Sequence, residues 1–191
     1  DASAPSGGNG GFVETSAAKV TLSDEARIST VSALGKVGKW LLDPTDLTIA
    51  PSGGDLTGKA VSTQLASNDV VLQSAMGTTT GNGDIFVNDR ISWSSGTSLS
   101  LLAGRNIQIN AEINASGNGA GVALNTGLFG GGQYVLGAGG RITLSGANPE
   151  FAVNGENYRV IQTLAQLQAI NDDLLGRYVL GTDINASATS T

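Results

Sequence analysis

Residues 83–113 read GDIFVNDRISWSSGTSLSLLAGRNIQINAEI, and this stretch repeats its own pattern of apolar residues. The apolar residues at positions 85, 87 and 91 return as isoleucines at 107, 109 and 113, and Asn88 and Ser94 return as Asn110 and Ser116. Apolar and polar residues alternate within each copy, which is typical of a strand with one buried face. A self-similar repeat of about 22 residues predicts a solenoid, in which each coil buries its apolar face against its neighbours.

Short alternating segments of the same kind occur within this stretch and on both sides of it. They are Val20–Leu22, Leu47–Ile49, Val70–Leu72, Ile85–Val87, Leu99–Leu101, Ile107–Ile109, Val122–Leu124 and Ile142–Leu144. The pattern of Leu99 returns one position late at Val122, and we expect it to return again at Ile142. A β-sandwich also has many short strands, but the repeated offset favours the solenoid. We therefore predict an all-β, parallel β-solenoid of roughly 20–22 residues per coil and roughly seven coils over residues 1–155.

The composition agrees with a narrow, turn-rich interior and excludes several functions. Glycine is frequent, at 28 residues, whereas aromatic residues make up only 5% of the chain. The net charge of −6 argues against nucleic acid as a partner, and no apolar run approaches the length of a membrane-spanning helix, so we expect no membrane insertion. Cysteine and histidine are absent, which excludes disulfides, histidine-dependent triads and histidine metal sites. The amino-terminal stretch lacks the basic and apolar regions of a signal peptide, so we expect a mature piece or a fragment.

The last quarter of the chain, from residue 156 to 191, has a different pattern. Thr163 and Gln166 have the spacing of a capping box, and leucines and an isoleucine then follow at helical intervals. We predict a short helix over residues 164–175 that ends before Gly176, and then a strand at Tyr178–Leu180. The helix-containing segment 156–191 either caps the solenoid or begins the next module of a longer chain.

Three stretches resemble the filamentous-haemagglutinin-type adhesins, which are large bacterial exoproteins exported by two-partner secretion. They are GGFVETSA at 10–17, GKWLLDPTDLTI at 38–49 and the repeat at 83–113. The closing stretch, 158–189, resembles the lead-in to the GLUG-type repeats that follow such segments. The NPNG- and NPNL-like turns of the family's amino-terminal secretion domain are absent, so we expect an internal or carboxy-terminal segment.

The resemblance implies a right-handed parallel β-helix on the bacterial cell surface or in the extracellular medium. It implies cell attachment or biofilm contact as the function, with no enzyme activity and no cofactor. The implied partners are host or matrix glycans and proteins, sister chains, and an outer-membrane transporter for the parent protein. Two alternatives stay open, a carbohydrate-active β-helix enzyme of the lyase or hydrolase type, and a self-assembling filament module in which open coil ends stack between molecules.

Four residues are candidates for ligand or metal binding. Trp40 could stack on a sugar ring, but its apolar neighbours favour packing between coils. Trp93 lies in the turn-rich segment SWSSGTS, and we expect it to be the more exposed aromatic residue. Asp43 and Asp46 could contribute to a calcium site, although their spacing favours turn hydrogen bonds because it matches no known calcium loop.

The enzyme alternative depends on a group of charged residues, Asp84, Asp89, Arg90 and Glu112. Paired carboxylates in a groove could act as general acid and base. When the two copies of the repeat are aligned, however, Glu112 occupies the position equivalent to Arg90, which predicts an ion pair between coils. The two sequons beginning at Asn114 and Asn185 are candidate glycosylation sites, and the glycine-rich stretch 127–140 is interpreted as a loop at a coil corner.

Overall fold

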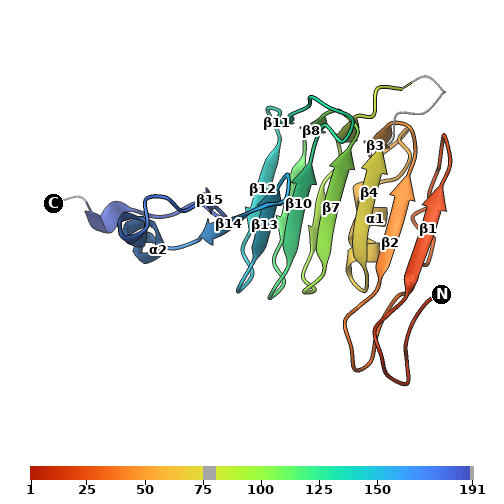
Figure 1. Cartoon of the computed structure of the whole chain (residues 1–191), viewed down its shortest axis with the longest axis horizontal. Helices are drawn as coiled ribbons and strands as arrows, with labels where there is room; N and C mark the ends of the chain where they lie inside the picture. Colours follow the sequence, from red (N-terminus) through yellow and green to blue (C-terminus); the bar gives the residue numbers. More distant parts are fainter. Residues whose placement is uncertain (75–80, 190–191) are drawn as a thin grey trace.

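Parallel strands wound into a β-solenoid of about five turns form most of the computed structural model, which describes residues 1–74 and 81–189 (Figure 1). The strands belong to three sheets, and a turn of the solenoid passes from one sheet to the next. The all-β, parallel solenoid predicted from the sequence is therefore confirmed.

The first sheet has the order β1-β2-β4-β7-β10-β13-β14-β15. Its strands are β1 Phe12–Ser16, β2 Lys39–Asp43, β4 Asp69–Ser74, β7 Ser98–Ala103, β10 Gly121–Asn125, β13 Glu150–Val153, β14 Glu156–Ile161 and β15 Tyr178–Leu180. The second sheet contains β3 Leu47–Ile49, β5 Ile85–Val87, β8 Ile107–Ile109 and β11 Tyr134–Leu136. The third contains β6 Ile91–Trp93, β9 Glu112–Ala115 and β12 Arg141–Leu144.

The repeat seen within residues 83–113 is a true coil. Ile85 in β5 pairs with Ile107 in β8, and Ile91 in β6 pairs with Ile113 in β9. Because equivalent residues stack from coil to coil, the interior consists of columns of apolar side chains. The residues Trp40, Val70, Leu99, Val122 and Phe151 form one such column of the first sheet, and all are buried. Each fully buried aliphatic side chain contributes roughly 1.5–3 kcal/mol of transfer free energy.

The predicted coil length is too short for most of the solenoid. In the first sheet Lys39 pairs with Asp69, and Val122 pairs with Phe151. Ile142, which we expected to stack on Val122, stacks instead on Ile113 in the third sheet. The corners lengthen where glycine can adopt positive φ, as at Gly131 with φ of 68°. Longer coils mean about five turns instead of seven.

A helix, α1, takes the place of a strand in one coil, and the alternating pattern did not predict it. It spans Gly58–Leu65, and its N-cap Thr57 accepts a hydrogen bond from the Ala60 N–H at 3.0 Å. Val61 and Leu65 are fully buried, and the Ser62 hydroxyl accepts a hydrogen bond from the Ser92 N–H of β6 at 2.9 Å. The helix therefore covers the outer edge of the third sheet, which would otherwise be unpaired.

The amino-terminal coil also differs from the sequence prediction. Val20–Leu22 is not a strand, although the Leu22 N–H donates to the Asp55 carbonyl at 2.8 Å. The strand of this coil is β1, in which Val13 pairs with Trp40 of β2. Each of these segments is short and alternating, so only the pairing partner separates strand from loop.

Parallel stacking stops at β13, because β14 pairs with β13 in the antiparallel sense. The connecting residues Asn154 and Gly155 both have positive φ, at 49° and 79°, as a tight hairpin turn requires. The segment that follows projects beyond the end of the solenoid (Figure 1). The division into domains at residue 155 stays a prediction.

The predicted capping box and the final strand β15 are both present. The Thr163 hydroxyl accepts from the Gln166 N–H, and the Gln166 side chain accepts from the Thr163 N–H. The helix α2 is only Leu164–Gln168, however, and continues as a short 3₁₀-helix to Asp172. It is shorter than the predicted 164–175 because Leu174 and Leu175, at 75% and 96% exposure, find no core to pack against.

Candidate functional site

Asp84 and Asp89, which the enzyme alternative required as free acids, are occupied by hydrogen bonds between coils. Asp84 Oδ1 accepts from the Asn106 N–H at 3.0 Å, and its carboxylate pairs with the Arg105 guanidinium, which lowers the pKa of Asp84. Asp89 Oδ2 accepts from the Gly58 N–H at 2.8 Å. Both carboxylates therefore hold neighbouring coils together.

Asp84 is one rung of a polar ladder at the corner before the second sheet. Asp46 Oδ1 accepts from the Asp84 N–H at 2.9 Å, and Asn106 Oδ1 accepts from the Gln133 N–H at 3.1 Å. Each side chain thus accepts a backbone hydrogen bond from the next coil. This arrangement explains why Asp or Asn precedes β3, β5 and β8.

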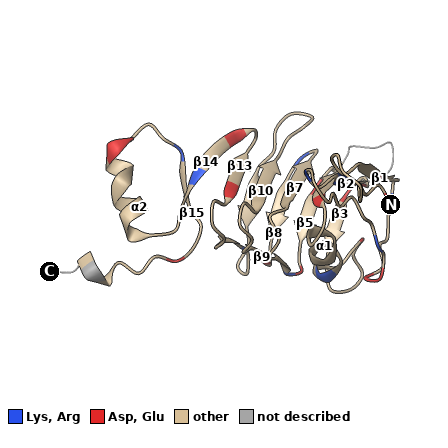
Figure 2. Cartoon of the chain, turned by 90° about the horizontal axis from the view of Figure 1, so that it is seen from below, with Lys and Arg blue, Asp and Glu red and all other residues tan. Residues whose placement is uncertain are grey.

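Glu112 joins three coils on the outer face of the third sheet. It accepts from Arg90 Nε at 2.9 Å, which confirms the ion pair expected from the repeat, and from Arg141 Nη2 at 2.7 Å. Thr143 adds a third hydrogen bond at 3.1 Å. The hydrogen bonds from Arg141 and Arg90 lower the pKa of Glu112 to about 2. Charges are otherwise sparse along the strands (Figure 2).

The two tryptophans are both buried, which overturns the expectation that Trp93 is exposed. Trp93 has 4% of its surface exposed, and its Nε1 donates to the Thr97 carbonyl at 2.9 Å. Trp93 and Ile91 lie on the same inward face of β6, under cover of α1. Trp40 is fully buried, and its Nε1 donates to the Thr15 hydroxyl at 3.3 Å, as expected for a packing residue. Neither indole can stack on a ligand without local unfolding.

Asp43 and Asp46, the calcium candidates, have different environments. Asp46 accepts from three backbone N–H groups, those of Asn82, Gly83 and Asp84. Asp43 accepts from Gln73 Nε2 at 3.0 Å, but its Oδ1 is buried with no hydrogen-bond partner. Burial and the charge of nearby Glu14 raise the pKa of Asp43. Within residues 1–74 and 81–189 no three acidic side chains form a group that could hold a metal ion.

The sequon asparagines differ in exposure. Asn114 lies half-buried in β9, paired with Ser92 and Thr143, and its side-chain oxygen is buried. Asn185 is exposed, and its side-chain oxygen accepts from the Ser187 N–H at 3.0 Å. Their glycosylation stays a prediction.

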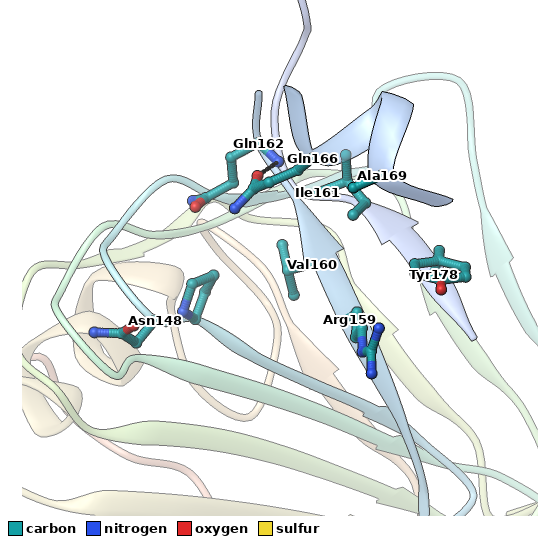
Figure 3. A pocket seen from close by; sticks show the side chains of 9 residues that line it. Asn148, Arg159, Val160, Ile161, Gln162, Gln166, Ala169 and Tyr178 are labelled. Carbon is teal, nitrogen blue, oxygen red and sulfur yellow. Dashed lines mark hydrogen bonds between the residues drawn. The ribbon is translucent and has the colours of Figure 1, made fainter. Parts of the chain in front are cut away.

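The structure brings together a pocket of about 380 Å³ that sequence reasoning missed, where the last coil meets the carboxy-terminal segment. We call it the junction pocket (Figure 3). Its lining comes from the β12–β13 loop, β14, α2 with its C-cap, and β15, through Asn148, Pro149, Arg159, Val160, Ile161, Gln162, Gln166, Ala169 and Tyr178. These residues all lie between 148 and 178, but they come from different elements and no single motif connects them. The capping box was the one visible signal, because it places Gln166.

The lining of the junction pocket combines apolar side chains with five polar ones. Arg159 is the one charged residue among the 9 that line it. The Gln162 side chain is already used, since its Nε2 donates to the carbonyls of Leu144 and Gly146. The Tyr178 hydroxyl donates to the Asp173 carbonyl at 2.6 Å, which fixes the orientation of the ring.

An apolar patch lies at the open edge of the second sheet. All three residues of β11 are exposed, at 40% for Tyr134, 43% for Val135 and 48% for Leu136. Leu128 and Phe129 of the preceding loop are also exposed, at 46% and 54%. β11 pairs only with β8 among the strands of the described chain, so its second edge is unpaired there.

Comparisons of the chain with protein-family models, with curated proteins and with solved structures found no match. None of the helices in the described residues has the length and apolar character needed to span a bilayer.

Proposed function

We propose that the chain is a structural and adhesive segment of a large, secreted bacterial surface protein. Its solenoid is a rigid rod that holds loops and the carboxy-terminal segment away from the cell. Adhesion to host or matrix glycans and proteins, or to sister chains in a biofilm, occurs through these surfaces. The parent protein reaches the surface through an outer-membrane transporter, as in two-partner secretion, and the carboxy-terminal segment leads into GLUG-type repeats.

The observation that carries this proposal is that the acidic side chains suspected of catalysis are hydrogen-bonded to neighbouring coils. Asp84, Asp89 and Glu112 each bind across coils, so these acids stabilise the rod and are not available to a substrate. A rod of stacked coils with hydrogen bonds between their corners suits a mechanical spacer. The resemblance to filamentous-haemagglutinin-type adhesins agrees with this assignment.

Attachment and turnover can be measured on the same purified chain. We expect the immobilised chain to retain cells or a glycan-coated surface above the level of an albumin-coated control. We also expect no new reducing or unsaturated ends when the chain is incubated with a panel of polysaccharides. Turnover of any polysaccharide in the panel would replace the adhesive function with an enzymatic one.

One observation favours the carbohydrate-active alternative, namely the pair of carboxylates on the outer face of the first sheet. Burial raises the pKa of Asp43 in β2, and the charge of Glu14 in β1 raises it further. A raised carboxyl pKa beside a second carboxylate is the electrostatic requirement for general acid catalysis. If the polysaccharide panel shows turnover, Asp43→Asn should abolish it, whereas Asp89→Asn should not.

A further inference from the structure

We propose that the junction pocket binds a saccharide that carries a carboxylate, such as a uronic-acid unit. The inference rests on the proposed adhesive function and names one ligand class and one location for it. It follows from the charge of the lining, from unused hydrogen-bonding groups on two amides, and from the apolar walls between them.

The charge of the pocket is opposite to that of the molecule. The chain has a net charge of −6, yet the lining contains the cation Arg159 and no acidic residue. The Arg159 side chain is 70% exposed, and its only ion-pair partner in the described chain, Asp173, lies 3.4 Å away and is itself 42% exposed. A guanidinium has five N–H donors and binds a carboxylate through two parallel hydrogen bonds. Arg159 therefore retains donors for a ligand carboxylate.

Two amides add directional polar groups. Gln166 Oε1 accepts from the N–H groups of Gln162 and Thr163 at 2.8 and 3.1 Å, which fixes the amide and directs its Nε2 away from the helix start. In Figure 3 this nitrogen lies on the side of the pocket that Asn148 borders. Asn148 donates through Nδ2 to Asn118 at 3.2 Å, which leaves its side-chain oxygen as an acceptor. A donor and an acceptor that border the same pocket suit the hydroxyl groups of a sugar ring.

The walls between these polar groups are apolar. Pro149, Val160 and the ring of Tyr178 line the cavity from the loop, β14 and β15. Apolar surface packs against the C–H face of a sugar ring, and the aromatic ring provides a large rigid contact. The volume of about 380 Å³ is at the lower end of ligand pockets, which fits one or two sugar units.

The lining favours a carboxylate over a phosphate. Phosphate sites in proteins use several cations or a cluster of backbone N–H groups, because the ligand has a charge near −2. The junction pocket has a single guanidinium, which matches the single charge of a uronic acid. The hydroxyl-binding amides and apolar walls would be unused by a small inorganic anion.

The first test is a titration of the intact chain with a galacturonic-acid trisaccharide, followed by calorimetry or by amide chemical shifts. The matched probe is the same trisaccharide with its carboxylates reduced to alcohols. We expect saturable binding of the acidic trisaccharide and at least a tenfold weaker association of the reduced one. Equal affinity for the two probes, or no binding of either, would overturn the inference.

Variants locate the binding in the junction pocket. Arg159→Gln should weaken the acidic trisaccharide at least tenfold. Arg177→Gln is the matched control, because Arg177 is ion-paired to Glu156 at 3.1 Å in the same segment but does not line the pocket. Asp173→Asn should strengthen binding a few-fold, since it releases Arg159 from its carboxylate. Equal losses in the two arginine variants would place the binding outside this pocket.

Gln166→Glu separates recognition from folding. Glutamate supports a capping box as well as glutamine does, so the helix start and the melting temperature should not change. The variant replaces the amide donor with a negative charge, and binding of the acidic trisaccharide should fall at least tenfold. Wild-type surface attachment that persists unchanged in Arg159→Gln and Gln166→Glu would reject the pocket while leaving the adhesive function in place. Absence of attachment by the wild-type chain would reject the adhesive function itself.

Discussion

Trp93 lies in a serine-rich segment, and its environment depends on one alternating triplet. Ile91, Ser92 and Trp93 form β6, and the two apolar residues point inward, so the serines around them say little about exposure. The hydrogen bond from the indole to the Thr97 carbonyl closes the corner at 2.9 Å. The period-2 pattern was a sufficient signal for burial, but the turn composition of SWSSGTS suggested a surface site instead.

Single-tryptophan variants test the burial of each indole. Trp40→Phe leaves Trp93 as the reporter, and Trp93→Phe leaves Trp40. Both variants should show blue-shifted emission and weak quenching by acrylamide, because both indoles are shielded from water. Trp93→Phe should also cost roughly 1–3 kcal/mol of unfolding free energy, since it removes the shorter of the two hydrogen bonds to the buried Thr97 carbonyl and leaves a gap where the larger indole packs. Emission from Trp93 that resembles free indole would contradict its burial.

Asp43 is a residue whose ionisation opposes folding. Burial and the charge of Glu14 raise its pKa, so the folded state binds a proton more readily than the unfolded state does. The resulting penalty is absent well below pH 3.8, grows as the pH rises, and is complete above the folded pKa. We expect Asp43→Asn to raise the free energy of unfolding by about 0.5–1 kcal/mol at pH 7 and to have no such effect near pH 3. Urea denaturation at the two pH values measures this, and equal effects at both would reject it.

At the scale of elements, the ion-paired residues Arg90, Glu112 and Arg141 form a charged triad that joins three coils. The repeat in the sequence predicted its first pair, because Arg90 and Glu112 are separated by the same offset as the strand residues beside them. The ion pair between Arg141 and Glu112 was not predicted, because it depends on the longer next coil, which pairs β12 with β9. The Glu112 carboxylate thus connects three neighbouring coils at the third sheet.

Glu112→Gln tests the charged triad of Arg90, Glu112 and Arg141 through the pH dependence of the unfolding free energy. The folded pKa of Glu112, about 2, lies below its ordinary value of 4.5, so its ionised form stabilises the folded state. That contribution is complete above about pH 5 and disappears as the pH falls through 4.5 toward 2. The exposed arginine partners reduce it, and we expect a loss of about 1 kcal/mol in the variant at pH 7. Asp55→Asn, at a carboxylate outside this triad, is the control. A loss of unfolding free energy in Glu112→Gln that is the same at pH 7 and pH 2.5 would contradict the stabilising role of the triad.

At the scale of the molecule, the three sheets are covered to different degrees at the carboxy-terminal end of the solenoid. At the carboxy-terminal end, the Leu144 N–H donates to the Gly181 carbonyl at 2.8 Å, and Tyr158 packs edge-on against Phe151 with 5.9 Å between ring centroids. β12 and β13 are therefore covered, whereas β11 is open. An uncovered, apolar sheet edge without charged residues favours association with another chain.

Self-association, the third alternative for this chain, should therefore depend on β11. We expect the sedimentation coefficient to rise with concentration, because chains bury the patch around Val135 against one another. Val135→Lys places a charge at the exposed edge and should remove most of this dependence. Gln108→Lys is the control, since Gln108 is the neighbour of Val135 on the outer face of β8. A strictly monomeric wild-type chain at high concentration would contradict the prediction.

The junction pocket shows the limit of sequence reasoning about sites. Thr163 and Gln166 were recognisable as a capping box because the signal is local. The meeting of Asn148, Arg159 and Tyr178 depends on the hairpin turn at Asn154, which reverses the chain after β13. Nothing in the individual segments indicates this convergence.

The sequence by itself determined the class of fold, because alternation with period 2 and the stacking of like residues are local and repeated properties. It also determined the interior position of Trp40 and the pairing of Arg90 with Glu112. Only the tertiary structure decided the register of the coils before residue 85 and after residue 124, the helix α1 in place of a strand, and the hydrogen bonding of Asp84 and Asp89 to neighbouring coils. The physical reason is that a coil corner can accept additional residues at little energetic cost, so the spacing between stacked residues is set by contacts between coils and not by the alternation within a strand.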